Sequence, residues 1–291
     1  MCILFVSTSP PPSSPYSLIL LSIRDEFFDR PTRKAGWDDG VLAGVDLQDK
    51  ARGTWFGVSR RGKVAVLLSI TQHKADKRED AISRGSIPSM YLRESPAASS
   101  PTSFCQSLAS RSTDFNGFQF VALQRNTSTG HFSMSSLTNC LVEKIEPQQW
   151  PCGSYVFGNS PPDRPFRKVL RGKHLFESIV ATITEGADED LLIERLLSMG
   201  LDTQRCHPDP QLVSQTDEWK SLFLSSIFVR FPPTIRYGTR CFTVLLVGKN
   251  GKARVQEKRL EEVPEDVTAA DWHTQDFHFE MNNSYEECSS L

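Results

Sequence analysis

Short apolar runs joined by tight turn signals dominate both ends of this 291-residue chain. Near the start, residues 2–6 (CILFV) and 16–23 (YSLILLSI) flank a Pro- and Ser-rich connection that cannot be the interior of a strand. Near the end, residues 241–248 and 252–260 flank Asn250–Gly251, a strong signal for a tight hairpin. Strands that return through hairpins pair antiparallel, so the sequence predicts antiparallel sheets.

Further strands are expected in the middle of the chain and near its end. Two more hairpins are predicted, one with strands at 53–59 and 63–70, the other with strands at 115–124 and 130–137, and a final strand is expected at 271–281.

Helical signals lie between these strands. Residues 163–183 carry apolar positions at helical spacing behind Asp163 as N-cap, and residues 188–200 begin acidic and end at Gly200. A weaker helical pattern lies within 78–94. Strands at both ends with helices between them predict an α+β fold: a four-layer αββα sandwich of two stacked, largely antiparallel sheets.

We expect residues 1–282 to form a single domain. The Ser-, Ala- and Pro-rich segment 95–114 is expected to be a solvent-exposed excursion, and residues 283–291 a flexible tail.

Composition narrows the functional class. The formal net charge of −2 favours neither a nucleic-acid partner nor an acidic tail. No secretory signal and no apolar run of membrane-spanning length is present. Seven cysteines, widely spaced and without a C-x-x-C pair, predict reduced thiols in a cytoplasmic protein and neither a disulfide framework nor a zinc site.

Cys2 is the first candidate for chemistry. If Met1 is removed, Cys2 carries both a thiol and a free α-amine, with ordinary pKa values of about 8.5 and about 7.7–8.0. One residue then supplies a nucleophile and a weak base. The alternative is that Cys2 is simply a thiol at the start of a strand.

Two charged residues follow the second strand. Arg24 and Asp25 lie where an antiparallel second strand would return towards Cys2, although such a charge run is more often a solvated loop. An aspartate accepting from an ammonium group, and an arginine beside a thiolate, would together lower a thiol pKa. Farther along, Asn159 lies in a Gly- and Pro-rich turn, where its amide could donate to an oxyanion or serve only turn geometry. Arg240 begins a strand, where a solvated charge is the ordinary interpretation.

Several blocks, in order, resemble the NRDE family, also called the transport-and-Golgi-organisation protein two family, over about residues 1–280. They are Met1–Cys2, RDEFFDRP, DGVLAGVDLQDKARGTWFGVSRRGKVAVLLSIT, FNGFQFVAL, GSYVFGNSPPDRPFRKVLRGK and YGTRCFTVLLV. The resemblance implies a fold like that of cysteine-type N-terminal-nucleophile hydrolases.

By this resemblance, Cys2 takes the nucleophile position, Arg24 and Asp25 the supporting pair, Asn159 an oxyanion position and Arg240 a further site position. Three positions depart from the family pattern, because Ile23, Ser69 and Phe242 stand where relatives carry Asn. Losing one oxyanion donor can cost about 100- to 1000-fold in rate. These departures count against amide hydrolysis.

Two functions follow as expectations from the resemblance. The first is a carrier or chaperone for a hydrophobic metabolite, haem or an acyl-CoA, linked to Golgi organisation and secretion. Such a carrier is expected in the cytoplasm near mitochondria or the Golgi, and it could contact a membrane peripherally. The second is a cysteine amidohydrolase or thioesterase that uses Cys2, for which we expect no cofactor. Aromatic residues near the site segments favour an apolar ligand; they are Phe27, Phe28, Trp37, Trp55, Phe56 and Phe157.

Haem would need an axial ligand, and the histidines show no metal-site spacing; those considered were His73, His131, His207, His273 and His278. Cys2 itself could ligate haem as a thiolate. We expect no metal site.

Overall fold

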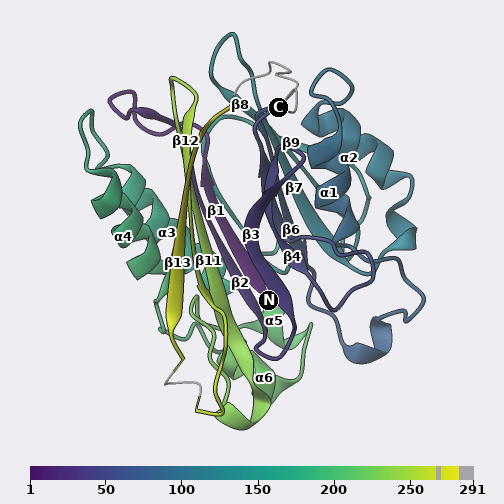
Figure 1. Cartoon of the computed structure of the whole chain (residues 1–291). Coiled ribbons are helices and arrows are strands. Elements are labelled where there is room, and N and C mark those ends of the chain that lie inside the picture. The colour runs from purple at the N-terminus through teal and green to yellow at the C-terminus, as the bar shows by residue number, and fades with distance from the viewer. Residues whose placement is uncertain (267–269, 282–291) are drawn as a thin grey trace.

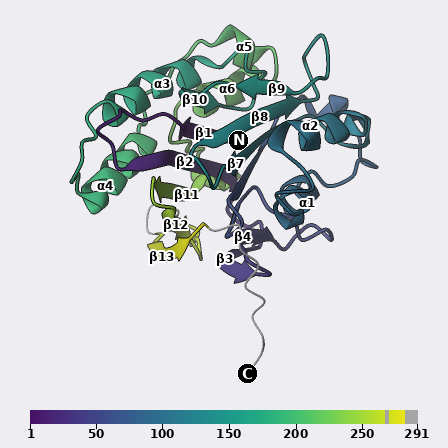
Figure 2. The same cartoon turned by 90° about the horizontal axis from the view of Figure 1, so that it is seen from above.

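Two antiparallel sheets stack face to face, with helices on both outer faces, in the computed structural model, which describes residues 1–266 and 270–281 (Figures 1 and 2). The first sheet has six strands in the order β10-β1-β2-β11-β12-β13. Its strands are β1 (Cys2–Ser7), β2 (Tyr16–Phe27), β10 (Ser154–Phe157), β11 (Tyr237–Gly248), β12 (Lys252–Leu260) and β13 (Trp272–Glu280).

The second sheet has seven strands that follow one another in the order β3 to β9. They are β3 (Thr32–Asp38), β4 (Val41–Asp46), β5 (Phe56–Ser59), β6 (Lys63–Ser69), β7 (Phe118–Arg125), β8 (Phe132–Thr138) and β9 (Gln148–Trp150). The predicted hairpins therefore form, and the long strand β2 leads through a turn from the first sheet into the second.

Helices cover the sheets on opposite sides. Helices α3 and α4 pack on the six-stranded sheet, and α1 and α2 pack on the seven-stranded sheet (Figure 2). The α-helices are α1 (Ser86–Arg93), α2 (Pro101–Ala109), α3 (Arg167–Val180), α4 (Glu189–Gly200), α5 (Pro210–Val213) and α6 (Glu218–Leu224). Three 3-10 turns complete the described elements: η1 (Lys74–Asp76), η2 (Ser112–Asp114) and η3 (Pro233–Ile235).

Strand β1 is buried on both faces, which explains its continuous apolar sequence. Leu4 and Val6 point into the core between the sheets, whereas Ile3 and Phe5 point into the core under α3 and α4. Successive side chains of a strand point to opposite faces, so one short strand helps to build two cores. The α+β αββα architecture predicted from the sequence is confirmed.

Two helix predictions differ in outcome. The helix expected at 188–200 is confirmed as α4, where the Asp188 side chain accepts from two backbone N–H groups of the first turn. The helix expected at 163–183 is shorter and begins at Arg167 rather than behind Asp163. Pro165 disfavours helical backbone at the residue before it. The exposed N–H of Arg167 is instead capped by the carboxylate of Asp209, at 2.6 Å, which local sequence cannot reveal.

The segment 95–114 is not the exposed excursion expected from its composition. It contains α2, which begins with a reciprocal capping box at Ser100 and buries Phe104, Cys105 and Leu108 against the seven-stranded sheet. Three apolar side chains on one helix face outweigh the Ser-rich composition around them. In the weak helical region 78–94, only 86–93 is helical as α1. The predicted tail at 283–291 lies outside the described residues.

Helix α3 approaches β1 closely at Gly172. A Cβ atom built there would lie 2.7 Å from a ring carbon of Phe5, whereas one built at Gly36 of β3 would meet nothing within 4 Å. We predict that Gly172→Val lowers the free energy of unfolding by about 2 kcal/mol through overpacking. Urea denaturation would measure it, with Gly36→Val as the matched control. Equal effects of the two substitutions would contradict the close approach.

Candidate functional site

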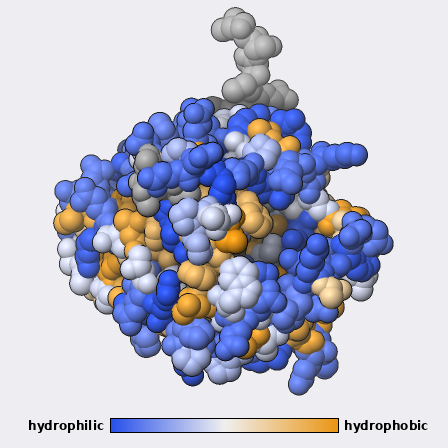
Figure 3. Space-filling view, turned by 90° about the horizontal axis from the view of Figure 1, so that it is seen from below, coloured by the Kyte–Doolittle hydropathy of each residue, from blue (hydrophilic) through white to orange (hydrophobic). Residues whose placement is uncertain are grey.

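A cleft of about 590 Å³ opens at the end of the sandwich where the N-terminus lies, and we call it the Cys2 cleft. Both sheets, the segment between β6 and α1, and α6 contribute to its lining. Figure 3 views the molecule from this end and shows hydrophobic side chains around a hollow, ringed by hydrophilic ones. Of the residues predicted to act together, Cys2, Arg24, Asp25 and Asn159 contribute to the lining of the cleft.

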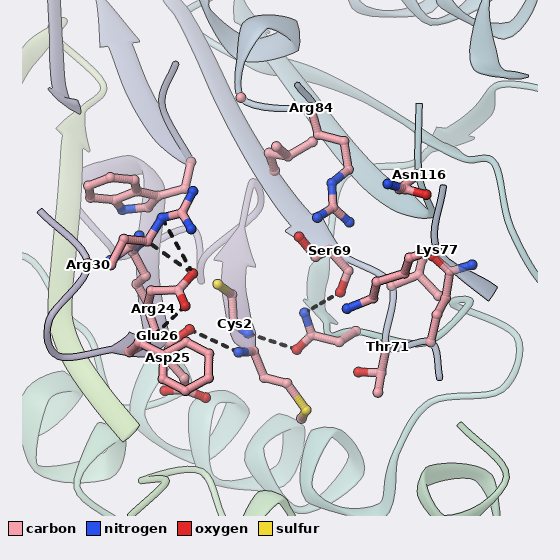
Figure 4. Close-up of a pocket in the computed structure, with 18 of the residues that line it drawn as sticks. Cys2, Arg24, Asp25, Glu26, Arg30, Ser69, Thr71, Lys77, Arg84 and Asn116 are labelled. Atoms are coloured by element: carbon pink, nitrogen blue, oxygen red, sulfur yellow. Dashed lines mark hydrogen bonds and ion pairs between the residues drawn. The ribbon is translucent and has the colours of Figure 1, made fainter. Parts of the chain in front are cut away.

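Cys2 is held by its backbone at the start of β1. It pairs with Arg24 of β2, and its nitrogen donates to Oδ1 of Asn159 at 2.7 Å. The amide nitrogen of Asn159 in turn donates to the carbonyl oxygen of Ser69 at 2.7 Å, tying the first sheet to the second. Asn159 thus positions the main chain of Cys2, while the sulfur points into the cleft (Figure 4). One amide proton of Asn159 is therefore already engaged.

Arg24 lies on the same face of the sheet as Cys2. Its guanidinium lies 4.1 Å from the centroid of the Trp55 ring and 3.8 Å from the carboxylate of Glu26. A cation stacked on an indole ring gains electrostatic stabilisation and is held in place. Arg24 therefore presents a fixed positive charge beside the Cys2 thiol, as the sequence predicted.

Asp25 points the other way. Because neighbours on a strand alternate, its carboxyl lies on the helix side, where Oδ1 accepts from Thr239 at 2.6 Å and Oδ2 is buried without a hydrogen-bond partner. Burial raises the pKa of Asp25, although the terminal ammonium and the buried ammonium of Lys168 oppose this rise. The terminal nitrogen of Met1 donates to the main-chain oxygen of Asp25 and to the hydroxyl of Tyr237. The expected contact of a Cys2 ammonium with the Asp25 carboxylate requires a chain without Met1 and stays a prediction.

Arg240 does not line the cleft, so its predicted place in a common site is wrong. Its guanidinium donates to the carbonyl oxygens of Phe27, Phe28 and Arg30. It therefore organises the turn that leads from β2 to β3. Burial lowers the pKa of Arg240 to about 10, so the side chain stays cationic at neutral pH. The sequence could not distinguish a carbonyl-binding arginine from a ligand-binding one.

Two of the three departures from the family pattern are core residues. Ile23 and Phe242 are buried in the core under α3 and α4, on the face opposite the Cys2 sulfur. They fill space against Gly200, where a Cβ would lie 2.9 Å from Phe242. Only Ser69 lines the cleft. The expectation that all three changes weaken the site is therefore wrong for Ile23 and Phe242.

Sequence reasoning missed several residues of the cleft. They are Glu26, Arg30, Lys77, Arg84, Trp219 and Tyr237. Glu26 and Arg30 lie within the charge run already noticed, and Tyr237 begins the YGTRCFTVLLV block on β11. Lys77, Arg84 and Trp219 lie in loop or helix segments with no motif around them. Of the aromatic residues that favoured an apolar ligand, only Phe27 and Trp55 line the cleft. The fully buried Lys168 beneath the site was also missed, because a lysine in a helix pattern normally indicates a solvated face.

The Cys2 thiol is not activated in the chain that retains Met1. Burial raises its pKa above the ordinary value, and the carboxyl of Asp25 adds to this rise. The terminal ammonium and Arg24 oppose the rise without overcoming it. Because the thiolate is the nucleophile, this environment holds Cys2 largely as the neutral thiol at neutral pH. The other five cysteines within the described residues are free thiols.

No group of three or more His, Cys, Asp or Glu side chains able to hold a metal ion occurs within residues 1–266 and 270–281. Over the same ranges, no helix combines the length and apolar character needed to cross a membrane.

Comparison with protein families identifies the family of this chain. The model of the family described as "Transport and Golgi organisation 2" matches residues 1–262. The chain belongs to this family. The Transport and Golgi organization 2 homolog of Mus musculus is 30% identical over 292 residues, covering 97% of this chain and all of the mouse protein. The Drosophila melanogaster member is 32% identical and covers 89% of this chain and 92% of its own length.

The solved structures that match this Transport and Golgi organisation 2 member share little sequence with it. A mutant conjugated bile acid hydrolase from Clostridium perfringens superposes with a TM-score of 0.48 at 10% identity, covering 94% of this chain and 96% of the hydrolase. A Caenorhabditis elegans orthologue of N-acylethanolamine-hydrolyzing acid amidase gives a TM-score of 0.38 at 9% identity, covering 84% and 92%.

The raised thiol pKa gives a pH prediction. In the chain that begins with Met1, alkylation of Cys2 by iodoacetamide follows the thiolate fraction. Its rate should therefore rise only above the pH at which a free cysteine peptide, with a pKa of about 8.5, reacts. Peptide-resolved mass spectrometry over a pH series would measure this rate, with Cys2→Ser identifying the peptide. A midpoint at or below that of the free peptide would show that the thiol is activated.

Proposed function

We propose that this protein binds an amphiphilic metabolite in the Cys2 cleft and hands it on, with an acyl-CoA as the leading ligand class. The observation that supports this proposal is the joining of an apolar end and a cationic wall in one cleft. The apolar end is lined by Trp219, Leu224, Phe231, Ile235 and Tyr237. The cationic wall carries Lys74, Lys77, Arg78 and Arg84. A ligand with an acyl chain and a phosphorylated carrier group matches both ends.

The apolar end is continuous with a small core. Leu224 and Phe231 belong both to the lining and to the cluster that also buries Phe166 and Val169, and the side chain of Met1 packs against that cluster. Trp219 and Ile235 remain half exposed at the edge. Clefts with an apolar interior and a polar rim are typical of small-molecule sites. The volume of the Cys2 cleft lies in the usual range of about 300–1,000 Å³ for such sites.

Haem is the second ligand class, because two propionates would also suit the cationic wall. Among the described residues that line the cleft, the axial candidates are the thiol of Cys2, the thioether of Met1 and the phenol of Tyr237, with no histidine. Burial raises the thiol pKa, which weakens Cys2 as a thiolate ligand. The acyl-CoA is therefore favoured over haem.

The cellular setting that we propose is traffic of this ligand through the cytoplasm, close to Golgi or mitochondrial membranes. A carrier releases its ligand unchanged, so a buried neutral thiol does not obstruct this role. The name itself supports only transport and Golgi organisation in a general sense.

The carrier proposal is tested by binding of palmitoyl-CoA. We predict that Trp219→Ser weakens binding about tenfold, which corresponds to about 1.4 kcal/mol of lost apolar contact. Cys2→Ser should change the Kd less than about twofold, because the sulfur makes no required bond to a carried ligand. Isothermal titration calorimetry would measure each Kd. The matched control is Leu191→Ser, an exposed apolar residue of α4 outside the cleft. Equal affinity of the wild type for CoA and palmitoyl-CoA would contradict the proposal.

A cysteine hydrolase is the second candidate function, and one observation favours it. The nitrogen of Cys2 already donates a hydrogen bond to Oδ1 of Asn159. In a chain beginning at Cys2, this bond would hold the α-amine beside the thiol. The amine would take the thiol proton while sulfur attacks the thioester carbonyl, and would pass that proton to the departing CoA thiolate, leaving S-acyl-Cys2. Water would then release the fatty acid, and sulfur would regain its proton.

Two chains with defined starts separate these functions. Cleavage of a fusion protein can yield chains that begin at Met1 or at Cys2. We predict that both release CoA from palmitoyl-CoA at a rate near that of the matching Cys2→Ala chains, measured by chromatography and mass spectrometry. Robust release by the chain beginning at Cys2, abolished in Cys2→Ala with binding preserved, would replace the carrier by a thioesterase.

A further inference from the structure

The two walls of the Cys2 cleft differ in how their cations are paired. On the wall nearest β2, Arg30 contacts Asp46 at 2.6 Å, and Glu26 lies between Arg24 at 3.8 Å and Arg30 at 4.0 Å. These charges are neutralised within the protein. They leave little attraction for an anionic ligand.

The opposite wall comes from the segment between β6 and α1 and carries unpaired cations. Within the described part of the chain, no carboxylate lies within 4.0 Å of the side-chain nitrogens of Lys77 or Arg84. The carboxylate with the strongest influence on Arg84 is Glu26, which is already shared by Arg24 and Arg30. Arg84 also lies close enough to Lys77 to lower the pKa of its ammonium.

Arg84 is fixed and faces the cavity. Its Nη1 donates to the carbonyl oxygen of Gly117 at 2.8 Å, and among the described residues the other guanidinium donors have no hydrogen-bond acceptor. Figure 4 shows the guanidinium directed towards Ser69, with Lys77 reaching into the same space from the side. Burial lowers the pKa of Arg84 and of Lys77. Two partly desolvated cations without a counterion are stabilised when an anion comes between them.

We propose that Arg84 and Lys77 form an anion subsite that binds a terminal oxygen anion, a carboxylate or a phosphate, of the ligand in the Cys2 cleft. The proposal rests on the function proposed above, that the cleft takes an amphiphilic ligand, and adds where its charge lies. The planar guanidinium offers paired N–H donors to two oxygens of one group, and the ammonium of Lys77 adds a point charge. The apolar part of the ligand then extends along the apolar lining that includes Trp219 and Phe231.

The experiment uses three ligands that carry the same alkyl chain: dodecanoate, dodecyl phosphate and the neutral dodecyl glucoside. We predict that Arg84→Gln weakens binding of the two anions by about 10- to 100-fold, the usual worth of a charge-assisted pair, and changes glucoside binding less than about twofold. Lys77→Gln should weaken the anions by about tenfold or less, and Arg84→Lys should lie between wild type and Arg84→Gln. Calorimetric titration at low salt gives each Kd. The anion that shows the larger loss identifies the headgroup.

Two further variants test whether the loss of binding is specific to the anion subsite. Arg195→Gln removes the same charge from α4 outside the cleft and should leave all three affinities unchanged. Lys77 makes no side-chain hydrogen bond in the described structure, so Lys77→Gln tests the subsite even if Arg84→Gln unfolds. Equal losses for the anions and the glucoside, or no loss for any ligand, would overturn the proposal.

The same titrations separate the two proposals. Palmitoyl-CoA binding that does not depend on Arg84 or Lys77 would leave the carrier standing and remove the subsite. Dodecyl phosphate binding that depends on both residues, with no palmitoyl-CoA binding, would remove the acyl-CoA proposal and leave the subsite.

Discussion

The pairing of β1 with β2, buried between a second sheet on one face and two helices on the other, is the constraint on which this structure depends. Antiparallel pairing places Cys2 directly opposite Arg24, and a shift by one residue would turn every side chain of β1 to the wrong core. The two apolar clusters that β1 joins therefore fix the register. The register in turn places a thiol and a guanidinium on the same face at the same end of the sheet.

The same alternation separates residues that are neighbours in sequence. Arg24 faces the space between the sheets and stacks on Trp55, whereas Asp25 faces the helices and accepts from Thr239. A charge run in the sequence thus becomes two environments with different chemistry. One holds a cation beside the ligand space, and the other holds a buried carboxyl near Lys168.

The elements that are determined by residues close in sequence could be predicted from the sequence. The hairpins, α4 with its Asp188 cap and the sandwich of two sheets follow from periodicity, capping and turn residues. The start of α3 could not be predicted, because its cap comes from Asp209, 42 positions away. The site divides in the same way. Arg24 follows from strand pairing, but Arg240 looks the same in sequence as a ligand-binding arginine and is occupied by three carbonyl oxygens.

The cationic wall lies in a segment that contributes little to the packed core. None of residues 71–85 is fully buried. Main-chain hydrogen bonds such as Thr71 N to Asn159 O and Ile82 N to Asp114 O attach the segment near its ends, and the Asn116 side chain binds the main chain of Arg78 in its middle. Because loops tolerate change better than the strands they join, we expect changes of charge at the exposed positions of this segment to leave both sheets and the Cys2–Arg24 pair intact. Selection can therefore retune which headgroup the protein prefers by altering one surface segment, and relatives with the same architecture can diverge in ligand at little cost in stability.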